Sequence, residues 1–326
     1  MNPLLRVHDL VVGFPHLTAV QGVSFHIDPG ETLALVGESG CGKSLTAFAL
    51  MRLLPRGARI LRGQVVFDGT DLVTARPQEL RAIRGKRVAL ILQEPMTSLN
   101  PVLTIGAQIA EAIRRHEAVS RAAARQRVVE LLDLVGIQDA AKRFGDYPHN
   151  FSGGMRQRVM IAMAVACNPQ LLIADEPTTA LDVTIQAQVL ELLDRLRRQL
   201  SMAVLLITHD LGVVSQWADR VAVMYAGRIV EQAAVGPFFA EPRHPYARGL
   251  LGASVGYGEG AHYSDTRLVE IPGTVASAAG EAGCPFAPRC PEVIAACRAA
   301  VPPLVRIGAG RAVACIREVA HVPALG

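Results

Sequence analysis

The sequence predicts an α/β fold: a mainly parallel sheet between helices, with an antiparallel side sheet before it and a helical insert inside it. Short apolar runs that alternate with helical patterns indicate the parallel strands, because such strands are buried on both faces and need helical crossovers. These runs are "ETLALV", "RVALILQ", "QLLIADEP" and "AVLLITHD". Alternating polar and apolar residues in "LLRVHDLVVGF", "AVQGVSFHID" and "GQVVFDGTDL" indicate the antiparallel strands.

Composition and charge limit the kind of partner. The 326 residues carry a net charge of only +4, from 33 basic and 29 acidic side chains, so nucleic acid is not indicated. The start has no secretion signal, and apolar runs such as "VMIAMAVAC" are about half of the roughly 18 to 20 residues that a membrane-spanning helix needs. We therefore expect a cytoplasmic chain that reaches a membrane through a partner, with cysteines as thiols or metal ligands.

The stretch "GESGCGKS", from Gly37 to Ser44, fits the phosphate-binding pattern G-x-x-x-x-G-K-[ST] and lies between a predicted strand and a predicted helix. Glycine at Gly37, Gly40 and Gly42 lets the backbone turn its N–H groups onto phosphates. The helix N-terminus adds a partial positive charge. Lys43 is predicted to reach the β- and γ-phosphates of ATP, and the Ser44 hydroxyl to bind Mg²⁺.

Polar side chains end the following predicted strands. In "LLIADEP", Asp175 is placed to hold Mg²⁺ through water and Glu176 to polarise an attacking water. Gln93, at the end of "RVALILQ", can bring an amide oxygen to the metal. His209, at the end of "LLITH", can bring an imidazole to the γ-phosphate. With the phosphate loop, these residues predict ATP hydrolysis.

The strand pattern stops between the second and third parallel runs, which predicts the helical insert. One helix, in "SRAAARQRVVELLDLVGI", is predicted to be capped by Ser120 and closed by Gly136. The stretch "FSGGMRQR" then places Ser152, Gly153 and Gly154 before another helix, which makes a second anion site. Since the first site already surrounds its phosphates, the second is expected to serve the nucleotide of another subunit.

Four of the six cysteines lie in the last fifth of the chain, at Cys284, Cys290, Cys297 and Cys315. Their spacings lack the paired C-x2-C of common zinc modules and the tight run of bacterial ferredoxins. Four thiolates close in sequence suit either a tetrahedral Zn²⁺ or an iron–sulfur cluster. Four buried cysteines without a metal are the third alternative, because free cysteine packs well as a small apolar side chain.

The phosphate loop, Gln93, "SGG", "LLIADEP", "ALD" and His209 occur in the order found in ATP-binding subunits of ABC transporters, which the chain resembles over roughly residues 5 to 250. The resemblance implies a P-loop NTPase with a RecA-like core, in which ATP closes a dimer and hydrolysis opens it. It implies that Phe14 stacks on adenine and that Asp182 lies in a loop that acts across the dimer, with the signature Ser152, Gly153 and Gly154.

The same resemblance implies the residues of each site. The ATP contacts are Phe14, Gly37, Ser39, Gly40, Cys41, Gly42, Lys43, Ser44 and Leu45. The magnesium ligands are Ser44, Gln93 and Asp175, and the catalytic residues are Glu176, His209 and Gln93. Leu45 stands where threonine is common, but it removes neither a charge nor a metal ligand. Cys41 is expected to be a reactive thiol, because a helix N-terminus lowers the pKa of a thiol.

The stretches "ILQEPMTSLNP", "EPRHPYARGLL" and the cysteine tail resemble, more narrowly, the ATP-binding subunits of oligopeptide and dipeptide importers. This resemblance implies an ATP-binding domain over 1–255, with a helical subdomain at about 95–165, and a small Cys-rich C-terminal domain over 256–326. The implied cofactors are ATP, Mg²⁺ and a 4Fe-4S cluster on Cys284, Cys290, Cys297 and Cys315, with Zn²⁺ as the alternative. Nickel and glutathione importers share the pattern.

The implied partners are a second ATP-binding subunit, two membrane permeases and an extracytoplasmic solute-binding protein, with the chain peripheral at the cytoplasmic face of the inner membrane. The alternative function is a soluble ABC ATPase that acts on nucleic acid, ribosomes or iron–sulfur assembly. Such proteins usually carry a coiled-coil insertion, two ATPase halves or a basic arm, and this sequence has none of them. A third interpretation makes the tail a redox sensor or a docking module.

Overall fold

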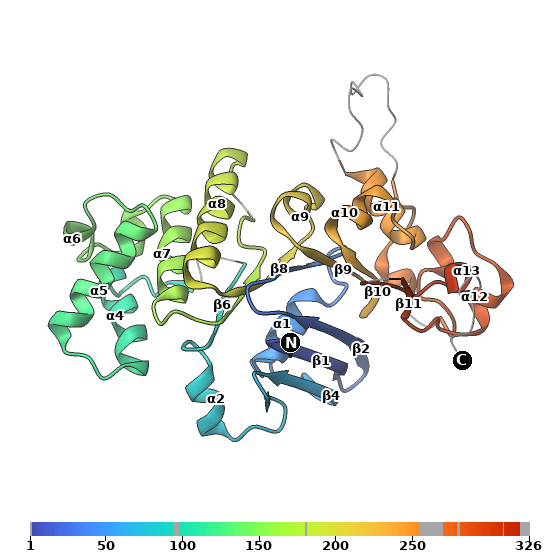
Figure 1. Cartoon of the computed structure of the whole chain (residues 1–326), viewed down its shortest axis with the longest axis horizontal. Helices are drawn as coiled ribbons and strands as arrows, with labels where there is room; N and C mark the ends of the chain where they lie inside the picture. Colours follow the sequence, from blue (N-terminus) through green and yellow to red (C-terminus); the bar gives the residue numbers. More distant parts are fainter. Residues whose placement is uncertain are drawn as a thin grey trace. The chain divides into compact units, whose positions relative to one another are not determined.

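A computed structural model describes residues 2–93, 98–179, 181–254, 270–278, 281–308 and 310–319 (Figure 1). The chain forms two compact units that interleave along the sequence. The first unit contains Met1–Leu4, Ile27–Glu31 and Thr74–Ile207. The second unit contains Leu5–His26, Thr32–Val73 and Thr208–Gly326, so the chain passes between the units several times.

Parallel strands form the sheet of the first unit: β6 (Val88–Ile91), β7 (Leu171–Asp175) and β8 (Ala203–Thr208). The first residue of β7 pairs with the first residue of each neighbour. Every residue of β7 and β8 is buried, as expected for a parallel sheet covered on both faces. The parallel strands predicted from these apolar runs are therefore confirmed.

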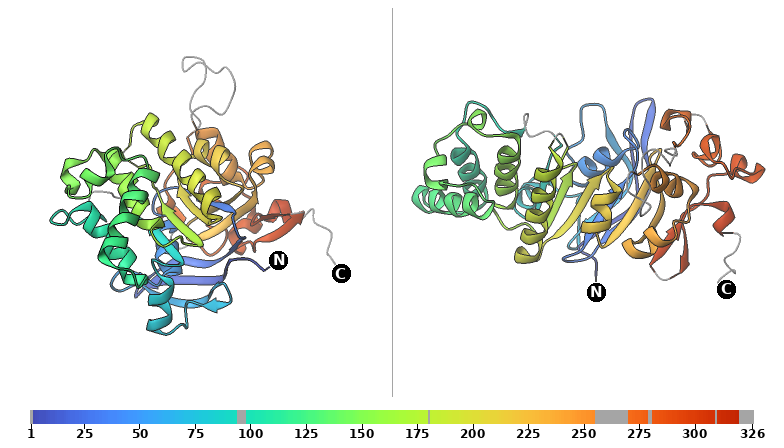
Figure 2. Two further views of the ribbon diagram at one scale, coloured as in Figure 1. Left: turned by 60° about the vertical axis from the view of Figure 1, so that its left-hand side comes forward. Right: turned by 90° about the horizontal axis from the view of Figure 1, so that it is seen from above.

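Helices make up most of the rest of the first unit, and Figure 2 shows those of the insert, drawn in green, gathered beside one another. The helices described for the whole first unit are α2 (Pro77–Ile83), α4 (Ile105–His116), α5 (Arg121–Leu134), α6 (Ala140–Arg143), η1 (Pro148–Asn150), α7 (Gly153–Val165) and α8 (Val183–Leu200). The predicted cap Ser120 is confirmed, because its Oγ accepts the N–H of Ala123 at 3.1 Å. Gly136 follows the end of α5 with a φ of 81°, as a helix-closing glycine should.

The antiparallel sheet predicted for the start of the chain lies in the second unit, in the order β2-β1-β4-β5. Its strands are β1 (Leu5–Phe14), β2 (Leu17–Ile27), β4 (Arg59–Phe67) and β5 (Thr70–Asp71). Asp68 and Gly69 both have positive φ and form the tight turn between β4 and β5.

The other sheet of the second unit has the order β11-β12-β10-β9-β3. Its strands are β3 (Thr32–Val36), β9 (Arg220–Tyr225), β10 (Arg228–Ala234), β11 (Val305–Gly308) and β12 (Arg311–Val313). Strands β3 and β9 are parallel, whereas β10, β11 and β12 add to them antiparallel. The end of the chain therefore extends the sheet that carries the phosphate loop.

Short helices complete the second unit. They are α1 (Lys43–Leu50), α9 (Leu211–Trp217), α10 (Val235–Ala240), α11 (Pro245–Ala253), η2 (Val275–Ala278), η3 (Ala287–Arg289), α12 (Ala295–Ala299) and α13 (Ile316–Val319). Among the helices that the structure describes, in either unit, none has the length and apolar character needed to cross a membrane.

The cysteine tail shares its core with the strands of the second unit. Tyr225 of β9 lies 4.6 Å from Tyr246 of α11 and 5.2 Å from Phe286 of the tail, measured between ring centroids, and all three rings are buried. Cys284 and Cys297 belong to the same core. The expected boundary between 255 and 256 lies outside the described residues. The described tail packs onto the strands instead of around a core of its own, because it has few large apolar side chains.

Truncating Phe286 is expected to destabilise the second unit. The Phe286→Ala variant should lose about 3–5 kcal/mol of unfolding free energy, because it leaves a cavity among Tyr225, Tyr246 and the buried cysteines. Urea unfolding followed by circular dichroism measures the change. The control is Ile294→Ala, since Ile294 is an exposed apolar residue of the same tail. Equal, small losses in the two variants would contradict a shared core.

Candidate functional site

The phosphate loop, residues 37–44, connects the buried strand β3 to α1 in the second unit. Two glycines are required by space as well as by backbone conformation. A Cβ on Gly37 would lie 2.2 Å from the carbonyl oxygen of Met224, and a Cβ on Gly42 would lie 2.9 Å from the carbonyl oxygen of Ala19. Both glycines also have positive φ. No side chain caps α1, so its N-terminus can serve an anion.

Lys43 begins α1 and folds back across the loop. Its Nζ donates to the carbonyl oxygens of Gly37 at 2.8 Å and Glu38 at 3.1 Å, and the side chain is buried. The ammonium is therefore held at the centre of the loop, where it can meet a phosphate. Phe14, at the end of β1, is exposed and can offer its ring to a base.

The carboxylate pair lies at the end of β7 in the first unit. Asp175 is buried, whereas Glu176 has a φ of 45°, a conformation uncommon outside glycine that turns its side chain out of the strand. The Glu176 Oε2 accepts hydrogen bonds from the Gln93 Nε2 and the Thr179 Oγ1, both at 2.9 Å. Gln93 lies just after β6, which ends at Ile91. The structure thus brings the predicted catalytic pair Glu176 and Gln93 into direct contact.

The signature residues form an exposed helix N-terminus in the first unit. Ser152 is the N-cap of α7, and its Oγ accepts the N–H of Met155 at 3.3 Å. Both Ser152 and Gly153 are exposed, while a Cβ on Gly154 would lie 2.6 Å from Ile185 of α8. Asp182 caps α8 by accepting the N–H of Ile185 at 3.0 Å. Gly154 therefore allows α7 to pack closely against α8.

His209 follows β8 and is exposed in the second unit. The next residue, Asp210, caps α9 by accepting the N–H groups of Gly212 and Val213 at 2.8 and 3.2 Å. The Asp210 N–H donates to the Thr208 Oγ1 at 3.0 Å. These bonds fix the backbone on both sides of His209. The predicted ATP residues therefore divide between the units, with Phe14, the phosphate loop and His209 in the second and Gln93, the carboxylate pair, the signature and Asp182 in the first.

The expectation of a reactive thiol at Cys41 is wrong. Cys41 is completely buried in the phosphate loop. Burial raises the pKa of its thiol and outweighs the opposing effect of Lys43. A neutral, inaccessible thiol is a poor nucleophile, so Cys41 acts as a small packing residue whose backbone carbonyl accepts the N–H of Gly227 at 2.9 Å.

The four tail cysteines line one small enclosed cavity, together with side chains that include Phe286 and His244. None of the six cysteines forms a disulfide. Burial first, and then the neighbouring Cys297, Cys290 and Cys315, raise the pKa of Cys284 to about 11. Among the described residues, no group of three or more His, Cys, Asp or Glu side chains could hold a metal ion, so the structure does not support the expected 4Fe-4S cluster or its zinc alternative.

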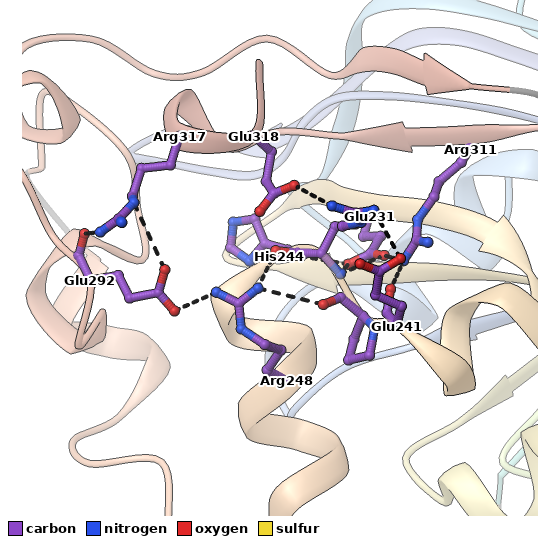
Figure 3. A network of polar contacts seen from close by, with 10 residues as sticks. Glu231, Glu241, His244, Arg248, Glu292, Arg311, Arg317 and Glu318 are labelled. Carbon is purple, nitrogen blue, oxygen red and sulfur yellow. Dashed lines mark hydrogen bonds and ion pairs between the residues drawn. The ribbon is translucent and has the colours of Figure 1, made fainter. Parts of the chain in front are cut away.

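A polar network joins the tail to β10 and to the "HPY" stretch (Figure 3). The carboxylate of Glu231 is fully buried and accepts the N–H groups of Arg243 and His244, the latter at 2.7 Å, and the guanidinium of Arg311 at 2.8 Å. Burial, with a smaller effect of Arg248, lowers the pKa of His244 to about 3, so its ring is neutral. The stretch "EPRHPY" contributes Arg243 and His244 to this network. The sequence does not indicate that Glu231 and Arg311 belong to the same network.

Replacing Glu176 should stop the chemistry without preventing nucleotide binding. We expect Glu176→Gln to hydrolyse ATP at least about 100-fold more slowly, because the amide cannot polarise water as a carboxylate does. The ATP affinity should stay near the wild-type value. Turnover and nucleotide binding of the assembled transporter measure the two quantities. Glu191→Gln, an exposed residue of α8, is the control; a normal rate in the Glu176→Gln protein would contradict the assignment.

Comparisons with known proteins agree with this geometry. The ABC transporter family model matches residues 20–179, and the model of the oligopeptide/dipeptide transporter C-terminal region matches residues 230–297. A probable peptide ABC transporter ATP-binding protein of Sinorhizobium fredii is 52% identical over 321 residues, which cover 97% of this chain and 95% of that protein. The oligopeptide transport ATP-binding protein OppD of Bacillus subtilis is 54% identical over 276 residues, covering 83% of this chain and 76% of OppD.

Solved structures show the same fold. An ATP-binding cassette solved as a dimer with ADP and phosphate has a TM-score of 0.63 and 25% identity, and the match covers 71% of this chain and 98% of that one. For cbiO1 of Clostridium perfringens, part of an ABC transporter complex, the TM-score is 0.64 with 26% identity over 74% and 92% of the two chains. The chain belongs to the ATP-binding proteins of ABC transporters, and within them to the oligopeptide/dipeptide branch.

Proposed function

We propose that this chain is the ATP-hydrolysing subunit that drives uptake of oligopeptides or dipeptides through separate permease subunits. The observation that carries the proposal is the near full-length similarity to peptide transport ATP-binding proteins, which includes the cysteine tail. A soluble ATPase that acts on nucleic acid or ribosomes is not favoured, since the same relatives are transport proteins.

In this proposal the phosphate loop and Lys43 bind the phosphates of ATP, and Phe14 stacks on its adenine. Ser44, Asp175 and Gln93 hold Mg²⁺, the last through its amide oxygen, because its amide nitrogen already donates to Glu176. Glu176 polarises the attacking water, and His209 contacts the γ-phosphate. The bonds from Gln93 and Thr179 support this role, because they hold the Glu176 carboxylate in one orientation.

The exposed signature is proposed to act on the nucleotide of a partner ATP-binding subunit, with Asp182 beside it. Support comes from Ser152 and Gly153, which present an uncovered helix N-terminus. A related cassette has been solved as a dimer with ADP and phosphate. We propose a heterodimer with a second, related ATPase, which would join two such sites across one interface.

The permeases are proposed to contact the first unit next to Gln93. Leu92, Val102 and Leu103 are large apolar side chains exposed on that unit, and Val102 is 75% exposed. We propose that a partner covers these side chains. Binding there would place the chain at the cytoplasmic face of the inner membrane, with an extracytoplasmic solute-binding protein delivering the cargo.

The four tail cysteines are proposed to hold a 4Fe-4S cluster. They converge on one buried cavity, and thiolates are the ligands of such clusters. Zinc on the same four cysteines is the alternative, because thiolates also bind Zn²⁺. When bound, the cluster would supply covalent cross-links between tail segments. We propose an ATP-binding domain over 1–255 and a Cys-rich C-terminal region over 256–326 that depends on these cross-links.

Uptake assays test the transport proposal. A strain without this chain should lose uptake of labelled peptides, and the wild-type gene should restore it. The Lys43→Ala gene should not restore uptake, because the phosphate loop then lacks its cation. The Glu191→Gln gene is the control and should restore uptake fully. Unchanged uptake of peptides, nickel and glutathione in the deletion strain would overturn the proposal.

Metal analysis tests the cluster. The protein purified without oxygen should contain about four iron and four sulfide per chain, because each cysteine of a 4Fe-4S cluster binds one iron. Cys290→Ser should lower the iron content, whereas Cys167→Ser should not, since Cys167 is a buried cysteine that does not line the cavity. One zinc per chain, or equal iron in both variants, would contradict the assignment.

A further inference from the structure

The tail contacts the phosphate loop directly at Glu38. Glu38 is the second residue of the loop, between Gly37 and Ser39, and it belongs to the same unit as the tail. Each of its three polar groups has a partner: the carboxylate binds Arg289, the N–H binds Tyr246 and the carbonyl oxygen binds Lys43. Two of these partners, Arg289 and Tyr246, lie more than 200 residues from the loop in sequence.

Arg289, in the "CPFAPRC" stretch, binds the Glu38 carboxylate with both terminal nitrogens. The Nη1–Oε2 distance is 2.8 Å and the Nη2–Oε1 distance is 3.0 Å. The side chain of Arg289 is only 3% exposed. Its Nε donates to the Pro272 carbonyl oxygen at 2.7 Å, and its Nη2 also donates to that of Ile271 at 3.2 Å. The guanidinium is therefore fixed on two sides, and the two-pronged contact fixes the carboxylate in turn.

Tyr246, from the "HPY" stretch, holds the backbone of the same residue. Its hydroxyl oxygen accepts the N–H of Glu38 at 2.9 Å. Its ring is completely buried beside Tyr225 and Phe286. The start of α11 is fixed too, because the His244 Nδ1 accepts the N–H of Tyr246 at 3.1 Å. The hydroxyl therefore reaches the loop from a rigid support.

We infer that Arg289 and Tyr246 are positioning residues for ATP binding, which together clamp Glu38 and set the path of the phosphate loop. A phosphate loop binds through N–H groups whose directions depend on the backbone at every residue. Lys43, the cation for the phosphates, also bonds to Glu38, so a displaced Glu38 displaces both kinds of donor. This inference rests on the proposed ATP site and gives the "HPY" stretch and the arginine before Cys290 a role in it.

The first test compares ATP affinity in variants of the full-length chain. Arg289→Met should weaken Mg²⁺–ATP binding about tenfold, because a phosphate loop released from the clamp must be ordered again when the nucleotide binds. Arg289→Lys should not restore the affinity, because an ammonium cannot make the same two-pronged contact. Tyr246→Phe should weaken binding less and without loss of packing, because it removes only the hydroxyl. Arg298→Met, an exposed arginine of the same tail, is the control and should bind as the wild type does.

The second test separates positioning from general stability. In the assembled transporter, Arg289→Met should raise the KM for ATP while kcat changes little, since the residue does not touch the reacting atoms. In the Glu38→Gln background, Arg289→Met should have a much smaller effect on affinity, because its partner charge is gone.

Unchanged ATP affinity in folded Arg289→Met and Tyr246→Phe proteins would overturn the inference. So would equal effects of Arg289→Met in the Glu38 and Glu38→Gln backgrounds. A wild-type chain that binds ATP but supports no peptide uptake would overturn the proposed transport function alone, because the clamp is measured by nucleotide binding.

Discussion

The buried carboxylate of Glu231 is the contact on which the C-terminal half of the second unit depends. A fully buried charge is tolerated only where it is paired and hydrogen-bonded, and the partners of Glu231 come from two segments of the chain. The N–H groups of Arg243 and His244 start the "HPY" helix, and Arg311 begins the tail strand β12. One side chain of β10 thereby fixes both the α11 helix, which carries Tyr246, and the strand that ties the tail to the sheet.

Local sequence patterns predicted the parts of the fold that local chemistry determines. Apolar runs located the buried strands, and Ser120 is the N-cap that the sequence predicts, because a short polar side chain can satisfy a helix N-terminus within three residues. The phosphate loop was predicted for the same reason, since its glycines and Lys43 act within eight residues of one another. To predict that Gln93 lies near Glu176, one further fact is needed: neighbouring parallel strands end at the same edge of a sheet.

Contacts between distant segments were not predictable in this way. Glu38 and Arg289 are 251 residues apart, and neither residue type in its own stretch indicates the other. The expected reactivity of Cys41 failed for a related reason: the helix N-terminus is local, but the burial that raises the thiol pKa comes from β9 and other segments packed around the loop. The shared core of the tail also depends on distant residues, because Phe286 contributes one ring to a cluster that β9 and α11 complete.

The hairpin of β11 and β12 also changes which strand stands at the edge of its sheet. Without it, β10 would leave a row of backbone N–H and C=O groups along seven residues, the kind of edge that pairs with strands of other molecules. Pairing with β12 covers part of that row, and the outermost strand becomes β11, which is four residues long and ends at Gly308. A short edge of this kind is a poor template for further strands. The tail hairpin therefore leaves this sheet with a shorter exposed edge than β10 alone would present.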